Sequence, residues 1–147
     1  MNETGMVFDR KGNPMLWHTP EGRSSGYLPD SQDLWEFLWE HRLKGGTGRL
    51  WGFAHTHPWY GRALPSSTDI STWEAIEQGL GQRLLWPIVT LSDVRYFIAT
   101  TKHDVPPLLG NPERVSYREV DPSVLGYDIK GFDKLRELSG SKEFPGT

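Results

Sequence analysis

Cysteine is absent from the 147 residues of this chain. Disulfides, thiolate metal sites and a cysteine nucleophile are therefore excluded, as are the zinc deaminases, whose site contains a Pro-Cys-x-x-Cys pattern. The sequence also lacks an apolar run long enough to span a membrane, and residues 1–13 lack the apolar stretch of a signal peptide. We therefore expect a cytoplasmic protein without a membrane partner.

An excess of positive charge is also missing. The chain has 16 Lys and Arg residues against 19 Asp and Glu, which gives a net charge of −3. Domains that bind nucleic acid usually carry a basic surface, so we expect no nucleic-acid partner. Tryptophan, by contrast, is abundant, with 7 residues. Such large aromatic side chains are typical of cores and of groove linings.

The pattern of apolar residues predicts one α/β domain over residues 1–147, a mixed β-sheet flanked by helices. Strands are predicted at residues 5–8, 14–17, 49–57, 84–91, 94–101 and 114–120, and helices at 31–46, 65–81 and 132–138. Residues 121–147 are interpreted as a C-terminal extension that is partly flexible.

The most informative stretch is residues 52–76, GFAHTHPWYGRALPSSTDISTWEAI. Side chains i and i+2 of a strand project to the same side, so His55 and His57 would lie next to each other while Thr56 faces the other way. Pro58 cannot donate to a sheet and should end the strand. Asp69 falls in the first turn of the next predicted helix, where the helix N-terminus favours an ionised carboxylate.

Two imidazoles and one carboxylate make a three-ligand set that leaves one position of a zinc ion open for water, as in catalytic sites. We therefore expect one Zn²⁺ per chain, held by His55, His57 and Asp69. The same residues also allow an interpretation without a metal. Ser66 and Asp69 match an ordinary capping box, and two histidines at a strand end could simply hydrogen-bond to a loop.

The segments H-T-H-P and S-S-T-D resemble the JAMM signature of the JAB1/MPN metalloprotease family, which also has a glutamate on an early strand. Residues 2–8, NETGMVF, are similar to that strand, and the resemblance spans residues 3 to about 100. It implies a cytidine-deaminase-like fold with zinc ligands His55, His57 and Asp69, Glu3 as general base and acid, and Ser66 as the hydroxyl that stabilises the oxyanion. The remaining candidates for the glutamate are Glu21, Glu36 and Glu40.

The resemblance further implies a zinc-dependent isopeptidase or peptidase, which hydrolyses the amide bond after the C-terminal tail of ubiquitin or a ubiquitin-like protein. The compact chain is typical of prokaryotic members. One alternative is a peptidase that processes a ubiquitin-like protein of the sulfur-carrier type. Another is a non-catalytic scaffold of the MPN type.

Other aromatic and histidine residues lie outside this set of candidate ligands. Trp59 and Tyr60 directly follow the H-T-H-P segment and are candidates to line the substrate channel, although they could equally be exposed aromatics that cover a loop. No chemical role is expected for His18, His41 or His103. His41 falls on the apolar face of the first predicted helix, which predicts a histidine in the core.

Overall fold

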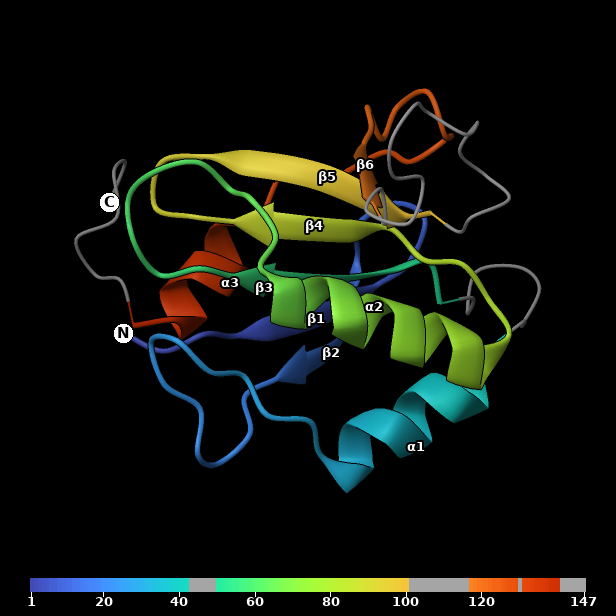
Figure 1. The fold of residues 1–147 in the computed structure, drawn as a ribbon, viewed down its shortest axis with the longest axis horizontal. Helices are drawn as coiled ribbons and strands as arrows, with labels where there is room; N and C mark the ends of the chain where they lie inside the picture. The colour runs from blue at the N-terminus through green and yellow to red at the C-terminus, as the bar shows by residue number, and fades with distance from the viewer. Residues whose placement is uncertain (43–49, 101–116, 130, 141–147) are drawn as a thin grey trace, which may run out of the picture.

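The computed structural model describes residues 1–42, 50–100, 117–129 and 131–140. These residues form one α/β domain around a six-stranded mixed sheet with the strand order β2-β1-β3-β4-β5-β6 (Figure 1). The elements are β1 (Gly5–Phe8), β2 (Pro14–His18), α1 (Gln32–His41), β3 (Gly52–Thr56), α2 (Ser67–Leu80), β4 (Trp86–Val89), β5 (Val94–Ala99), β6 (Tyr117–Glu119) and α3 (Asp133–Leu138). None of these helices has the length and apolar character needed to cross a membrane.

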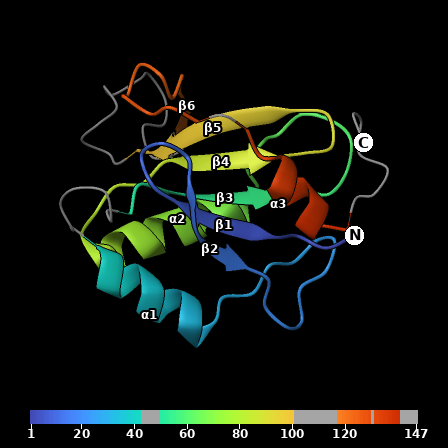
Figure 2. The same ribbon diagram turned by 180° about the vertical axis from the view of Figure 1, so that it is seen from behind.

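The one parallel strand pair described in the sheet is β3 with β4, and all other neighbouring strands run antiparallel. Two parallel strands need a crossover connection, and α2 provides it. The chain leaves β3 at its C-terminal end, and the first turn of α2 lies close to that same end (Figures 1 and 2). This topology places a helix N-terminus beside the histidine motif.

Helices cover both faces of the sheet. Helices α1 and α2 pack on one face, where they bury Leu38 and Trp73 against Phe53 and other core residues. Helix α3 packs on the opposite face, where Leu135 is buried against a second apolar cluster (Figure 2). Alternation along β3 therefore assigns each of its side chains either to the α1/α2 face or to the α3 face.

The centre of the sheet is tightly packed where β3 begins. A Cβ atom added at Gly52 would lie 2.2 Å from the Phe8 ring and 2.7 Å from the Leu85 carbonyl oxygen. Glycine is therefore required at this point, because the backbone of β3 passes directly against both neighbours.

Each predicted element is present: β1 has the predicted limits, β2 is one residue longer, and the others are shorter. The strand predicted at 49–57 is Gly52–Thr56, and the last predicted strand is Tyr117–Glu119, since residues 114–116 lie outside the described part of the chain. The prediction that His41 lies in the core is wrong. His41 is only half-buried and stacks on Phe37 with ring centroids 4.0 Å apart, because it lies in the last turn of α1, beyond the buried residues Leu34 and Leu38.

Candidate metal centre

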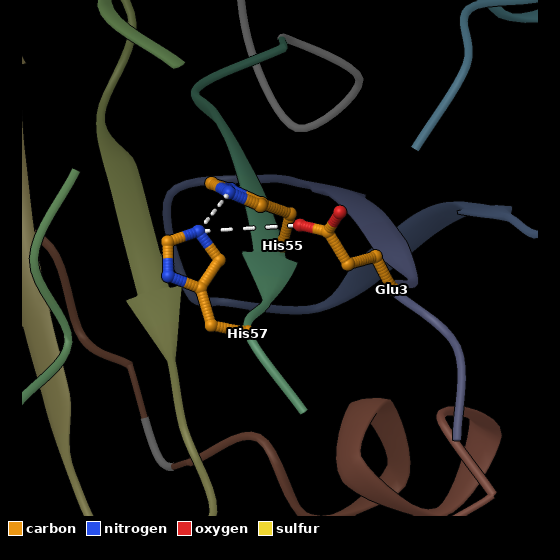
Figure 3. A group of neighbouring side chains, drawn as sticks. All are labelled: Glu3, His55 and His57. Carbon is orange, nitrogen blue, oxygen red and sulfur yellow. Dashed lines mark hydrogen bonds and ion pairs between the residues drawn. The ribbon is translucent and has the colours of Figure 1, made fainter. Parts of the chain in front are cut away.

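The two histidines of the motif meet at the C-terminal end of β3. His55 follows Phe53 on the α1/α2 face, and the His57 N–H donates to the Val89 carbonyl oxygen (2.9 Å), which keeps the chain extended beyond the strand. The two Nε2 atoms lie 3.1 Å apart, and both rings are buried. Figure 3 shows the two imidazoles pointing toward one another.

Asp69 completes this group from the first turn of α2. Its Oδ1 lies 3.1 Å from Nε2 of His55, and its Oδ2 lies 3.1 Å from Nε2 of His57. The same residue forms a capping box, since Oδ2 accepts the Ser66 N–H (2.9 Å) and Ser66 Oγ accepts the Asp69 N–H (3.1 Å). The two interpretations of this segment are thus compatible, because a carboxylate can accept several hydrogen bonds at once.

Glu3 reaches the histidines from the segment that leads into β1. Its Oε1 lies 4.0 Å from Nε2 of His57, and the residue is only 6% exposed (Figure 3). Glu3, His55 and His57 each offer one ligand atom, all within 4.8 Å of one another, and this buried group could hold a metal ion. The other candidate glutamates, Glu21, Glu36 and Glu40, are exposed.

Hydrogen bonds hold the Glu3 segment firmly although it lies near the start of the chain. The Glu3 N–H donates to the Ser24 carbonyl oxygen at 2.7 Å, and the Asn2 N–H donates to the Ser139 carbonyl oxygen at 2.9 Å. Thr4 pairs with Thr56 in both directions, because the Thr4 N–H donates to Thr56 Oγ1 (2.9 Å) and the Thr56 N–H donates to the Thr4 carbonyl oxygen (3.0 Å). The backbone on both sides of Glu3 is therefore fixed.

A buried hydroxyl cluster, formed by Thr4, Thr56 and Ser139, lies on the α3 face of β3. The Oγ1 of Thr56 is 2.7 Å from the Oγ of Ser139, which is 3.4 Å from Oγ1 of Thr4. Arg23 donates to Thr4 Oγ1 and to the Leu138 carbonyl oxygen (3.2 Å). The sequence indicated only that Thr56 faces away from the histidines. Nothing in the local pattern pointed to its partners.

The pKa values of the two carboxylates, Glu3 and Asp69, are shifted in opposite directions. Burial raises the pKa of Glu3 to about 7, with the charge of His57 lowering it and the charge of Asp69 raising it. Burial also acts to raise the pKa of Asp69, but hydrogen bonds from His55 and His57 outweigh it and hold this pKa well below its ordinary value. At neutral pH Asp69 is ionised, whereas Glu3 is close to the midpoint of its titration.

Trp59 and Tyr60 differ in their relation to this group. The indole of Trp59 stacks on the His57 ring, with centroids 4.8 Å apart and planes inclined by 25°. Trp59 also lines a cavity of about 890 Å³ that includes Glu3, His55 and His57. Tyr60 is 63% exposed and does not line that cavity. His18, for which no role was expected, does line it.

The spacing of the inward-facing atoms fits a metal ion. A tetrahedral zinc ion with ligand bonds of about 2.0–2.1 Å separates its ligand atoms by about 3.3–3.4 Å. The two histidine Nε2 atoms are 3.1 Å apart, and each also lies 3.1 Å from a different oxygen of Asp69, Oδ1 for His55 and Oδ2 for His57. Such a set of two imidazoles with carboxylates defines a candidate mononuclear metal centre. A scan of the chain against protein-family models finds no match, and a search of the curated proteins finds none either.

Proposed function

We propose that this chain is a zinc-dependent peptidase or isopeptidase of the JAMM type, which hydrolyses the amide bond after the C-terminal tail of a ubiquitin-like protein. One observation carries the proposal. Asp69 meets His55 and His57 at nearly the spacing of zinc ligands, while the buried Glu3 carboxylate stands further off, 4.0 Å from His57. The substrate class comes from the resemblance of the H-T-H-P and S-x-x-D segments to the JAMM signature.

The two carboxylates have different roles in this proposal. Asp69 is the third zinc ligand, because it is ionised and contacts both imidazoles. Glu3 is the general base and acid, since its buried carboxyl lies 4.0 Å from His57, near enough to exchange a proton with a water molecule beside the histidines. Glu3 thus takes the proton from the attacking water and gives it to the departing amine.

The remaining residues assist these two steps. A bound zinc ion supplies Lewis acidity, which lowers the pKa of water to about 7 and polarises a carbonyl group. Ser66 Oγ accepts the Asp69 N–H, so its hydroxyl proton is directed elsewhere and can donate to the oxygen that becomes negative in the transition state. Trp59 stacks on His57 and restricts the orientation of that ring.

The first test is the metal content of the purified full chain. We expect one zinc per chain in the wild type and in His41→Ala, a histidine variant away from the site, and none in His57→Ala. Zinc that stays bound in His57→Ala would refute the ligand set.

The second test is cleavage of a ubiquitin-like protein fused through its tail to a reporter, with a precursor of the sulfur-carrier type as a second substrate. We expect Glu3→Gln to keep its zinc and to lose cleavage. Zinc binding without cleavage of any fusion by the wild type would instead support the non-catalytic scaffold.

A further inference from the structure

We propose that the guanidinium of Arg62 binds a carboxylate of the substrate close to the amide that is hydrolysed, so that acidic substrates are preferred to neutral ones. This inference rests on the proposed function and narrows its substrate class. Arg62 lines the cavity of about 890 Å³ that also includes Glu3, His55 and His57. Of the described residues that line this cavity, Arg62 is the one Lys or Arg. A substrate at the candidate metal centre therefore shares the cavity with one permanently positive side chain.

The backbone on both sides of Arg62 is fixed by the turn between β4 and β5. The Gly61 N–H donates to Ser92 Oγ at 2.9 Å. The Ala63 N–H donates to Asp93 Oδ2, also at 2.9 Å, and the side chain of Ala63 is fully buried. Arg62 thus lies between two anchored neighbours. A loop that is already ordered loses less entropy when it binds a ligand, which favours recognition by this residue.

The side chain of Arg62 is exposed, and it makes no hydrogen bond, ion pair or ring contact with another described residue. Two neighbouring carboxylates have other partners. Asp93 Oδ2 accepts the Arg95 Nε–H at 2.8 Å, and Asp30 Oδ2, on the cavity lining, accepts the Trp35 Nε1–H at 3.0 Å. The guanidinium can therefore bind an external anion without first breaking a contact within the described chain.

The chemistry of the substrate identifies this anion as a carboxylate. The N–H groups of a guanidinium form a planar fork that fits both oxygens of a carboxylate. A polypeptide substrate offers such a group from two sources, the α-carboxylate of a leaving amino acid or an Asp or Glu side chain of the tail. Asp30 and Asp69 line the same cavity and repel either group, whereas Arg62 attracts it.

The test uses the zinc-loaded full chain and acetylated peptides that are hydrolysed after a Gly-Gly pair. One pair of peptides ends in Gly-Gly-Ala, with either a free carboxylate or a carboxamide at the C-terminus. The other pair keeps the carboxamide and has Glu or Gln directly before Gly-Gly. We expect the acidic member of one pair to be cleaved about fivefold faster in kcat/KM, mainly through a lower KM, because an exposed ion pair contributes to binding rather than to the chemical step. The pair that shows the preference identifies the source of the carboxylate.

Three variants of Arg62 test whether this residue causes the preference. Arg62→Ala should remove most of it, Arg62→Lys should keep part of it, and Arg62→Glu should reverse it, which a folding defect cannot do. The matched control is Arg118→Ala, an exposed arginine of β6 that does not line the cavity, and it should keep the preference. Equal cleavage within both pairs by the wild type would overturn the inference. An acidic preference that persists in Arg62→Glu would overturn it too, because the zinc ion would then account for the binding of the carboxylate.

A binding measurement separates this inference from the proposed function. Titration calorimetry of the same peptides into the full chain with Glu3→Gln, the variant expected not to cleave them, should show about fivefold tighter binding of the acidic member. Adding Arg62→Ala should remove this difference. Binding with this pattern, combined with no cleavage of any peptide by the wild type, would refute the peptidase and support the role of Arg62. Equal affinities within both pairs would refute that role whether or not cleavage occurs.

Discussion

Thr56 Oγ1 and Ser139 Oγ lie 2.7 Å apart, which joins the centre of the histidine motif to the end of α3. Thr56 lies between His55 and His57 in the sequence, but its side chain faces the opposite side of the sheet. The hydroxyl cluster therefore lies on the α3 face of β3, opposite the candidate metal centre, and contributes no ligand to it. It also connects the two histidines to the segment that carries Glu3, because Thr4 belongs to the same cluster.

The first prediction concerns this cluster. Thr4→Val keeps the shape of the side chain and removes one hydrogen-bond partner each from Arg23 and Ser139, which keep their bonds to Leu138 and Thr56. We expect the free energy of unfolding to fall by about 1–3 kcal/mol, because buried polar groups lose hydrogen bonds. Zinc content should be unchanged, since the proposed ligands lie on the other face.

Urea unfolding and metal analysis measure these two effects. Thr4→Ser, which keeps the hydroxyl, should recover most of the stability. Ser123→Ala removes an exposed hydroxyl that contacts Asp121 and should change stability by less than about 0.5 kcal/mol. The role assigned to the cluster is wrong if Thr4→Val is as stable as the wild type.

The second prediction separates the two roles of Asp69. Asp69→Asn keeps an oxygen that can accept the Ser66 N–H, while Asp69→Ala removes this half of the capping box together with the charge. The bond from the N–H of residue 69 to Ser66 Oγ remains in both variants. We expect both variants to lose zinc. In the presence of a chelator, the alanine variant should be about 1 kcal/mol less stable than the asparagine variant, the usual net contribution of one hydrogen bond.

Metal analysis and urea unfolding again provide the measurements. Asp33→Asn changes the acidic residue in the first turn of α1 and should retain zinc, which makes it the matched control. Zinc binding by Asp69→Ala would show that the ligands are Glu3, His55 and His57 instead.

The third prediction concerns the pH dependence of stability. His18 is buried, and its Nε2 lies 2.6 Å from the Pro29 carbonyl oxygen. Burial lowers its pKa, an effect that Arg23 increases and that Pro29 and Asp30 oppose. The unfolded chain therefore takes up the proton more readily. Protonation of His18 therefore favours the unfolded chain. The folded chain is most stable above the ordinary histidine pKa of 6.5, and this stability is lost as the pH falls below that value.

The measurement is the unfolding free energy in urea at pH 7.5 and at pH 5.5, made with a chelator to exclude metal binding. His18→Gln should lose less stability between these two pH values than the wild type, because its side chain does not titrate. An equal loss in the two proteins would show that His18 is protonated as easily in the folded chain as in the unfolded one.

The fourth prediction tests the close packing at the start of β3. Gly52→Ala places a methyl group within 2.2 Å of the Phe8 ring and 2.7 Å of the Leu85 carbonyl oxygen. We expect a loss of about 1–3 kcal/mol in the free energy of unfolding, as is typical of overpacking. Thermal or urea unfolding measures it. Gly26→Ala meets no atom within 4 Å and should be nearly neutral, so similar losses in both variants would contradict the packing argument.

The parts of the fold that follow from local patterns could be predicted from the sequence. Alternation placed His55 and His57 on one face of β3, and the S-x-x-D pattern placed Asp69 in the first turn of α2. Helical spacing likewise predicted a helix over residues 65–81, and Trp73, Ile76 and Leu80 of α2 are buried in the structure. Each of these features depends only on residues that are close together in the sequence.

The parts that depend on distant contacts could not be predicted. No local signal shows that residues 2–4 are fixed by Ser24 and by Ser139, which lies 135 positions beyond Thr4. The period of either helix alone likewise does not show that Leu38 of α1 and Trp73 of α2 pack in the same core cluster. Even for Asp69, the pattern suggested a cap or a ligand, and only the three-dimensional arrangement shows that the two are compatible.

The contact between Thr4 and Ser139 has a consequence for local unfolding. Transient opening of α3 would break the contacts of Ser139 with Asn2, Thr4 and Thr56, while the hydrogen bonds of Glu3 with Ser24 and of Thr4 with Thr56 could persist. The Glu3 carboxylate would then stay beside the two imidazoles while the backbone of Asn2 is released from Ser139. Hydrogen exchange at the amide of Asn2 should therefore follow the opening of α3, whereas the amides of Glu3 and Thr4 should stay protected.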